Sequence, residues 1–75
     1  MIELKIKLET IEKVYSFVAT VTKYEYDADV ICGRYVVNAK SIMGLFSLDL
    51  LSPLTLNIHA ENADELVAEL APYLA

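Results

Sequence analysis

The 75-residue chain is long enough for one domain, residues 1–75, and its 56% hydrophobic and 23% charged residues supply too much core material for disorder. Its formal net charge of −5 and its six scattered basic residues argue against binding to nucleic-acid phosphates. No apolar run approaches the roughly 18 residues of a membrane span, and residues 1–8 alternate charged with apolar side chains, unlike a signal peptide. We therefore expect a cytoplasmic protein with no nucleic-acid or membrane partner.

The first two elements differ in the period of their apolar residues. Apolar and charged residues alternate from Ile2 to Glu9, which predicts a strand with one buried and one solvent-facing side. From Glu12 to Glu25 the apolar residues recur at helical spacing, with Thr10 as the candidate N-cap. The helical stripe consists of Val14, Phe17, Val18 and Val21, with Tyr24 or Glu25 as its continuation.

A hairpin and a short helix form the middle of the chain. The runs 29–32 and 35–38 read as two strands, and Gly33-Arg34 between them fits a two-residue turn in which glycine takes a positive φ. Ser41 then stands at the start of a helix that we expect to end near residues 48–50. Pro53 prevents that helix from continuing.

The last third repeats the two patterns. Residues 54–61 alternate and predict another strand, and Asn62 followed by Glu65 three positions later resembles a capping box at the start of a third helix. We expect Pro72 to fray or kink the last turn of this helix. Its buried stripe is predicted to consist of Leu66, Val67, Leu70 and Leu74.

The order β-α-β-β-α-β-α, with amphipathic helices and half-buried strands, predicts an α+β fold. In this fold a four-stranded antiparallel sheet carries three helices on one face, as an open-faced β-sandwich. The open face of the sheet is expected to carry Glu3, Lys5, Lys7, Thr55, Asn57 and His59.

The single cysteine and the single histidine suggest no reactive site. Cys32 alone cannot form an internal disulfide or a cysteine metal cluster, and we expect it to be a small buried residue. His59 is expected to be a solvent-exposed residue of a strand, because no nucleophile or orienting acid accompanies it. The sequence therefore predicts no metal, no cofactor and no enzymatic residue.

The run from Asn38 to Leu48, NAKSIMGLFSL, resembles the central motif of the histidine-containing phosphocarrier family, HPr, of the bacterial sugar phosphotransferase system. It differs in having Phe46 where the family has methionine, and the match stops at Asp49, where the family usually has glycine. Residues 26–30 and the acidic pair Asp64-Glu65 also resemble segments of that family. The resemblance implies an HPr-like fold for most of the chain.

In HPr proteins a histidine before the first helix takes up the phosphoryl group beside an arginine. An ungapped count back from Tyr26 places Glu12 at the histidine position and Val14 at the arginine position, and no other histidine exists in this region. Three interpretations of Glu12 remain: a first-turn acid that favours the helix dipole, a permanent mimic of the phosphohistidine charge, or an acceptor that forms an acyl phosphate.

The resemblance also implies two features of the second helix. Ser41 stands where HPr proteins of many Gram-positive bacteria, and relatives that lack the histidine, are phosphorylated by a dedicated kinase; a simple helix cap is the alternative. Lys40 is placed to screen such a phosphate. Met43 and Phe46 stand where HPr proteins meet their partners, and Tyr15, Leu50 and Leu51 are candidates to extend this surface, although core packing is the alternative.

These observations predict a non-catalytic regulatory or protein-interaction module that docks through the Glu12 end of the first helix and the Ser41 helix. One alternative is a phosphocarrier of the phosphotransferase system that uses another acceptor residue. The other is a diverged structural or self-associating domain, either a monomer or a homodimer formed through Met43 and Phe46.

Overall fold

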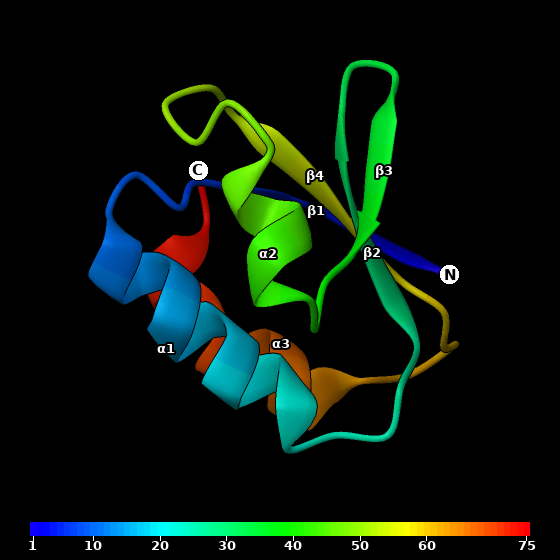
Figure 1. The fold of residues 1–75 in the computed structure, drawn as a ribbon. Coiled ribbons are helices and arrows are strands. Elements are labelled where there is room, and N and C mark those ends of the chain that lie inside the picture. Colours follow the sequence, from blue (N-terminus) through cyan, green and yellow to red (C-terminus); the bar gives the residue numbers. More distant parts are fainter.

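Four strands and three helices follow one another in the predicted order in a computed structural model that describes residues 1–75 (Figure 1). A short 3₁₀ turn, Ala71–Tyr73, follows the last helix. The elements are β1 (Ile2–Ile6), α1 (Ile11–Thr22), β2 (Ala28–Cys32), β3 (Tyr35–Asn38), α2 (Ile42–Phe46), β4 (Leu54–Ile58) and α3 (Asp64–Glu69).

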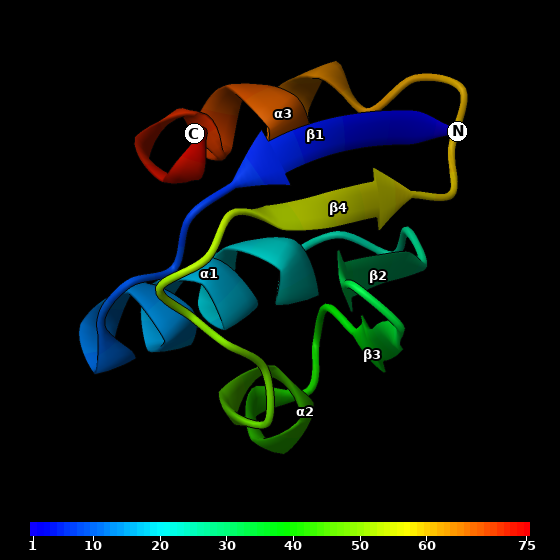
Figure 2. The ribbon, with the colours of Figure 1, turned by 90° about the horizontal axis from the view of Figure 1, so that it is seen from above.

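The strands form one antiparallel sheet in the order β1-β4-β2-β3. The helices pack on one side of it and leave the other side open (Figures 1 and 2). This arrangement confirms the predicted open-faced α+β sandwich. The register pairs Ile6 with Leu54 and Ile2 with Ile58, so the two ends of β4 meet the two ends of β1. Gly33 has a φ of 60° in the β2–β3 turn, as predicted.

The core between the sheet and the helices is wholly apolar. All 18 buried residues are hydrophobic, and they form a single cluster. The predicted stripe of α1 is buried from Val14 to Val21, whereas Tyr24 is half-buried and Glu25 is exposed beyond the end of the helix. It faces the inward residues of the sheet, Ile6, Val30, Leu54, Leu56 and Ile58, each of which is fully buried.

The first two helices are shorter than predicted. α1 ends at Thr22 rather than Glu25, because the Lys23 N–H caps the helix on the carbonyls of Thr20 and Val21. α2 ends at Phe46 rather than at residues 48–50: the Ser47 hydroxyl donates to the carbonyl of Gly44 at 2.6 Å and closes the helix locally. At both ends local hydrogen bonds satisfy carbonyls of the last turn, although the apolar pattern of the helix continues.

The prediction for the start of α3 was wrong. The N-cap position holds Ala63, which is buried and makes no side-chain cap bond, while Oδ1 of Asn62 accepts a hydrogen bond from the N–H of Asp64 at 3.1 Å. The predicted capping box does not form. The Asn62 side chain instead closes a turn with the N–H of Asp64, two residues later in the chain. α3 thus begins at Asp64 without a side-chain cap on its N-terminus.

The C-terminal segment also departs from the predicted helix. Pro72 lies in the 3₁₀ turn, and Leu74 is exposed because the chain leaves the helix there and forms a β-bridge with Ile6. Val67 is only half-buried, whereas Leu66 and Leu70 fill the core as predicted. Tyr73 is held by a T-shaped contact with Phe17 and a 2.7 Å hydrogen bond to Ser16.

The open side of the sheet carries the predicted polar residues. Lys5 Nζ donates to Thr55 Oγ1 at 2.7 Å, and His59 Nε2 lies 2.8 Å from Asp29 Oδ2. Cys32 is only half-buried and has no disulfide partner.

A polar clamp joins the end of α1 to α3. The carboxylate of Glu69 accepts hydrogen bonds from the ammonium of Lys23 and the hydroxyl of Tyr24. The bond from Lys23 is the main reason that the pKa of Glu69 lies below its ordinary value. The bond to Glu69 is the main reason that the pKa of Tyr24 is raised to about 12. Tyr24 also stacks on Tyr26, with ring centroids 6.1 Å apart.

The clamp predicts a pH dependence with two limits. The contribution of Glu69 is present above its ordinary pKa of 4.5 and is lost as the pH falls through its lowered folded pKa. The contribution of Tyr24 is present below pH 10.0 and is lost as the pH rises toward about 12. We expect Glu69→Gln to shift the titration of Tyr24 back toward 10.0, measured by tyrosinate absorbance as the difference between each protein and its Tyr24→Phe version.

Glu65→Gln is the matched control, because Glu65 acts on Tyr24 only through its charge. It should shift the titration of Tyr24 less than Glu69→Gln does. Equal shifts in the two variants would contradict the hydrogen bond to Glu69 as the main cause.

Candidate functional site

The start of α1 is built by Thr10. Its backbone is extended, with a φ of −124° and a ψ of 159°, and its Oγ1 accepts a hydrogen bond from the N–H of Lys13 at 3.1 Å. Thr10 is therefore the N-cap, as predicted, and it is the residue that immediately precedes the helix. Glu12 lies in the first turn, exposed to solvent, where its charge interacts favourably with the helix dipole.

Val14 does not lie at this surface. It is fully buried and belongs to the core stripe of α1. A side chain buried in the core cannot contact a phosphoryl acceptor that faces solvent. The structure therefore does not support the ungapped count, which put Val14 at the arginine position. If the acceptor position is instead the residue just before the helix, it holds Thr10, and the position two residues later holds Glu12. Sequence reasoning missed this placement, although the cap signal of Thr10 was available to it.

The only histidine is remote from the start of α1. The register places Ile6, and hence the β1–α1 connection, beside Leu54 at the first residue of β4. His59 follows the last residue of the same strand. A five-residue strand spans about 17 Å, so His59 lies at the opposite end of the sheet, paired with Asp29 on the open side.

Tyr15, Met43 and Phe46 form an exposed apolar surface that we call the α1–α2 face. The rings of Tyr15 and Phe46 meet in a T-shaped contact with centroids 5.9 Å apart, which joins the two helices. Met43 lies one turn before Phe46 on α2 and is 86% exposed. Ile11, four residues before Tyr15 on α1, is also largely exposed. It was missed as a candidate, although its spacing from Tyr15 could have indicated it.

The loop after α2 contributes differently from the prediction. Leu50 is half-buried and packs against the core, so it is a packing residue more than a surface one. Leu51 is 77% exposed and remains a candidate for contact with a partner. Asp49 stabilises this loop through hydrogen bonds to the N–H of Leu51 and the hydroxyl of Ser52.

Ser41 is the N-cap of α2, as predicted. Its Oγ accepts a hydrogen bond from the N–H of Gly44 at 3.1 Å, and its own N–H donates to the carbonyl of Asn38. Ser41 is half-buried rather than freely exposed. A Cβ on Gly44 would lie 3.1 Å from both Ser41 Oγ and Val37 Cβ, so α2 sits very close to β3 at this point.

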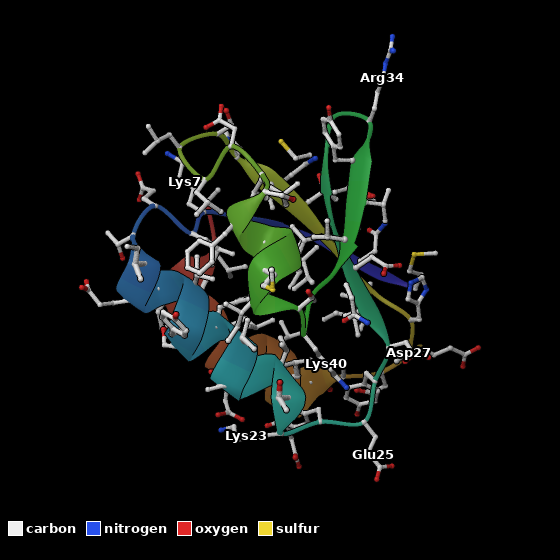
Figure 3. All side chains as sticks on the ribbon, in the orientation of Figure 1. Lys7, Lys23, Glu25, Asp27, Arg34 and Lys40 are labelled. Atoms are coloured by element: carbon white, nitrogen blue, oxygen red, sulfur yellow. The ribbon has the colours of Figure 1, made fainter.

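Lys40 does not point toward Ser41. Its ammonium donates to the backbone carbonyl of Tyr24 at 2.8 Å, just beyond the end of α1 (Figure 3). The prediction that Lys40 screens a phosphate on Ser41 is therefore wrong for this conformation. Lys40 instead ties the β3–α2 connection to the chain that leaves α1.

The site is an open surface. The structure has no pocket, no group of His, Cys, Asp and Glu residues arranged to hold a metal ion, and no helix that is both long and apolar enough to cross a membrane. What the α1–α2 face offers chemically is exposed apolar area beside a carboxylate and two helix N-termini.

The chain is similar to known proteins in sequence and in structure. Residues 13–75 match the family model "PTS HPr component phosphorylation site". The crystal structure of HPr-C-His from Thermoanaerobacter tengcongensis superposes with a TM-score of 0.80 at 26% identity, covering 96% of this chain and 89% of that one.

The phosphocarrier protein HPr from Bacillus anthracis str. Ames superposes with a TM-score of 0.77 at 25% identity, covering 99% of this chain and 96% of that one. No match was found among curated proteins. Because the family model spans most of the chain and the whole fold superposes, the chain belongs to the HPr family of the phosphotransferase system.

Proposed function

We propose that this HPr-family protein is a non-catalytic, cytoplasmic interaction or regulatory module that docks on a protein partner through the α1–α2 face. The observation that carries the proposal is the exposed apolar surface of Tyr15, Met43 and Phe46 beside the start of α1. Apolar side chains gathered in this way on a small domain are typical of contact surfaces. The partner belongs to the phosphotransferase system or to the proteins that it regulates.

The chemistry at the start of α1 supports a role without phosphoryl relay. A phosphohistidine requires an imidazole near the helix N-terminus and a cation beside it. Here Thr10 and Glu12 occupy that end of α1, and the nearest cation, Lys13, lies 3.9 Å from Glu9. With Thr10 at the acceptor position, the carboxylate of Glu12 places a negative charge where the relay needs a cation.

Phosphorylation of Ser41 is the switch that we propose for this face. A phosphate on the Ser41 hydroxyl would add about two negative charges two residues before the exposed Met43. It would also disturb the 3.1 Å bond by which that hydroxyl caps α2. In the unmodified protein the N–H of Gly44 holds this hydroxyl at the start of α2, and Ser41 is half-buried.

A phosphocarrier that uses another acceptor is the second candidate, because the chain belongs to the HPr family, although the matched residues 13–75 do not include the start of α1. The available groups are the hydroxyl of Thr10 and the carboxylate of Glu12. An acyl phosphate on Glu12 would be labile, whereas a phosphate on Thr10 would be a stable ester that is poorly suited to relay.

Docking on a partner can be followed residue by residue. We expect titration of the ¹⁵N-labelled protein with the first enzyme of the phosphotransferase system, or with a candidate regulatory partner, to shift the amide signals of the α1–α2 face. Met43→Lys should weaken binding about fivefold or more, since removing a central apolar contact costs more than about 1 kcal/mol. Lys7→Ala, on the connection between β1 and α1, serves as a control outside the face. Shifts confined to the open side of the sheet would contradict the proposed docking face.

Phosphoryl transfer can be tested directly. Incubation with phosphoenolpyruvate and the first enzyme should leave the protein unlabelled, with an HPr protein that carries the active histidine as the positive control. Label on Glu12 or Thr10 would establish the second candidate instead.

Two rebuilt variants add a sharper control to this test. Thr10→His combined with Glu12→Arg should gain label, because it places an imidazole just before the helix and a cation two residues later. Glu12→His alone should not. Label on the second variant alone would show that the ungapped count was correct.

The Ser41 switch has its own test. Incubation with ATP and the HPr serine kinase should label Ser41, and absence of label would remove the switch. Ser41→Ala should lose about 1 kcal/mol of stability with the cap, whereas Ser41→Asn should keep the cap and the stability but not the label. Urea unfolding of the two variants separates the role of the cap from the role of the modification.

A further inference from the structure

The two edges of the sheet are protected very differently. At the β1 edge, the N–H of Lys7 donates to the carbonyl of Tyr73 at 2.7 Å and the N–H of Ala75 donates to the carbonyl of Lys5 at 2.9 Å. The C-terminal residues thus cover this edge, and β1 also carries the charged residues Glu3 and Lys5. Covering and charge are the usual means by which proteins prevent edge-to-edge pairing of sheets.

The β3 edge has neither protection. No strand lies beyond β3 in the sheet, and Tyr35–Asn38 contains no charged residue and no proline. Tyr35 is 70% exposed and Val36 is 60% exposed. Figure 1 shows that the β2–β3 hairpin extends beyond the helices at its tip, and Figure 3 shows Arg34 pointing outward there.

The register identifies which backbone groups of this edge are free. The N–H of Ala39 donates to the carbonyl of Ala28, so this pair is hydrogen-bonded across the ladder. Hydrogen-bonded pairs alternate along an antiparallel ladder, so Val30 with Val37 is another such pair, and Ile31 with Val36 is not. The N–H and the carbonyl of Val36 therefore face away from β2, toward solvent.

We propose that the protein self-associates by antiparallel pairing of β3 with the β3 of a second copy, around a two-fold axis at Val36. The N–H of each Val36 then donates to the carbonyl of the partner's Val36, and the two four-stranded sheets become one. On the helix side Tyr35 lies opposite the partner's Val37. This interface is separate from the α1–α2 face, so it does not depend on the proposed function.

The charge distribution favours a second copy at this edge. The chain carries a net charge of −5, so two copies repel each other over most of their surfaces. No acidic residue occurs between Asp29 and Asp49, and the only charges in that segment are Arg34 and Lys40. The β3 edge is therefore where like-charge repulsion between two copies is weakest. One short strand buries less than the roughly 1,200 Å² of stable interfaces, so the association is weak and depends on concentration.

Sedimentation equilibrium of the full chain, from micromolar to millimolar concentration, tests the proposal. The measured mass should rise toward twice that of the monomer. Val36→Pro should remain monomeric, because it removes the outward N–H without removing a bond of the β2–β3 ladder. Val36→Lys should also remain monomeric, and it preserves the test if the proline variant does not fold, as judged from its ¹H–¹⁵N spectrum. Met43→Lys is the matched control on the α1–α2 face and should still dimerise.

Three outcomes would overturn the proposal. The first is a wild-type chain that stays monomeric at millimolar concentration, in which case the free edge is available only to a different protein. The second is a dimer that persists in folded Val36→Pro or Val36→Lys. The third is a dimer that is lost in Met43→Lys and kept in the Val36 variants, which would place the self-association on the α1–α2 face.

Discussion

The fold depends on the burial of β4 between β1 and β2. β4 is the last strand in the sequence, yet it pairs on both sides, and the N-terminal strand joins the β2–β3 hairpin only through it. Its inward residues Leu54, Leu56 and Ile58 are fully buried beneath the helices. Because this central strand comes late in the chain, the sheet forms only when contacts between distant residues form. The apolar alternation of residues 54–58 fixes the register of those contacts and so largely determines the fold.

The position of β4 also separates the polar groups of the molecule. The first residue of β4 lies beside the last residue of β1. The start of α1 and the α1–α2 face therefore lie at the same end of the sheet. The other end of β4 leads to His59 and Asp29 on the open side. The only imidazole of the protein is thus about a strand length from the start of α1. The family match and the absence of a histidine near α1 are compatible because the fold depends on the apolar pattern and not on the acceptor residue.

The elements with a periodic apolar pattern could be predicted from the sequence. The helix ends, which depend on individual hydrogen bonds, and the residue at the start of α1, which depends on the length of a connection, could not. The strands and the core stripe of α1 were predicted because a buried face imposes its period on every residue. The ends of α1 and α2 were not, because the bonds made by Lys23 and Ser47 end them within a continuing apolar pattern. The N-cap position of α3 holds Ala63 and not the expected Asn62, whose side chain bonds the N–H of Asp64 instead.

The candidate site was predicted in part, for a related reason. The exposed residues of α2 follow from helical spacing, whereas the count back from Tyr26 depends on the lengths of the connections, and a gap of one residue changes which residue stands at the acceptor position. Only the position of the helix cap, Thr10, fixes where the element begins. The direction of the Lys40 side chain depends on a carbonyl 16 residues earlier in the chain, so no local pattern could reveal it.

The residues of the central motif differ in how strongly they argue for function. Ser41 and Gly44 have a structural reason to be present, because the serine caps α2 and a Cβ on Gly44 would lie 3.1 Å from both Val37 Cβ and Ser41 Oγ. Their occurrence is therefore explained by close packing of α2 on β3, whether or not Ser41 is modified. Met43 has no such reason, since 86% of it is exposed and a polar residue at that point would cost the fold nothing in packing. The proposal of a docking face consequently rests more firmly on Met43, and on Phe46 held against Tyr15, than on the serine that begins the helix.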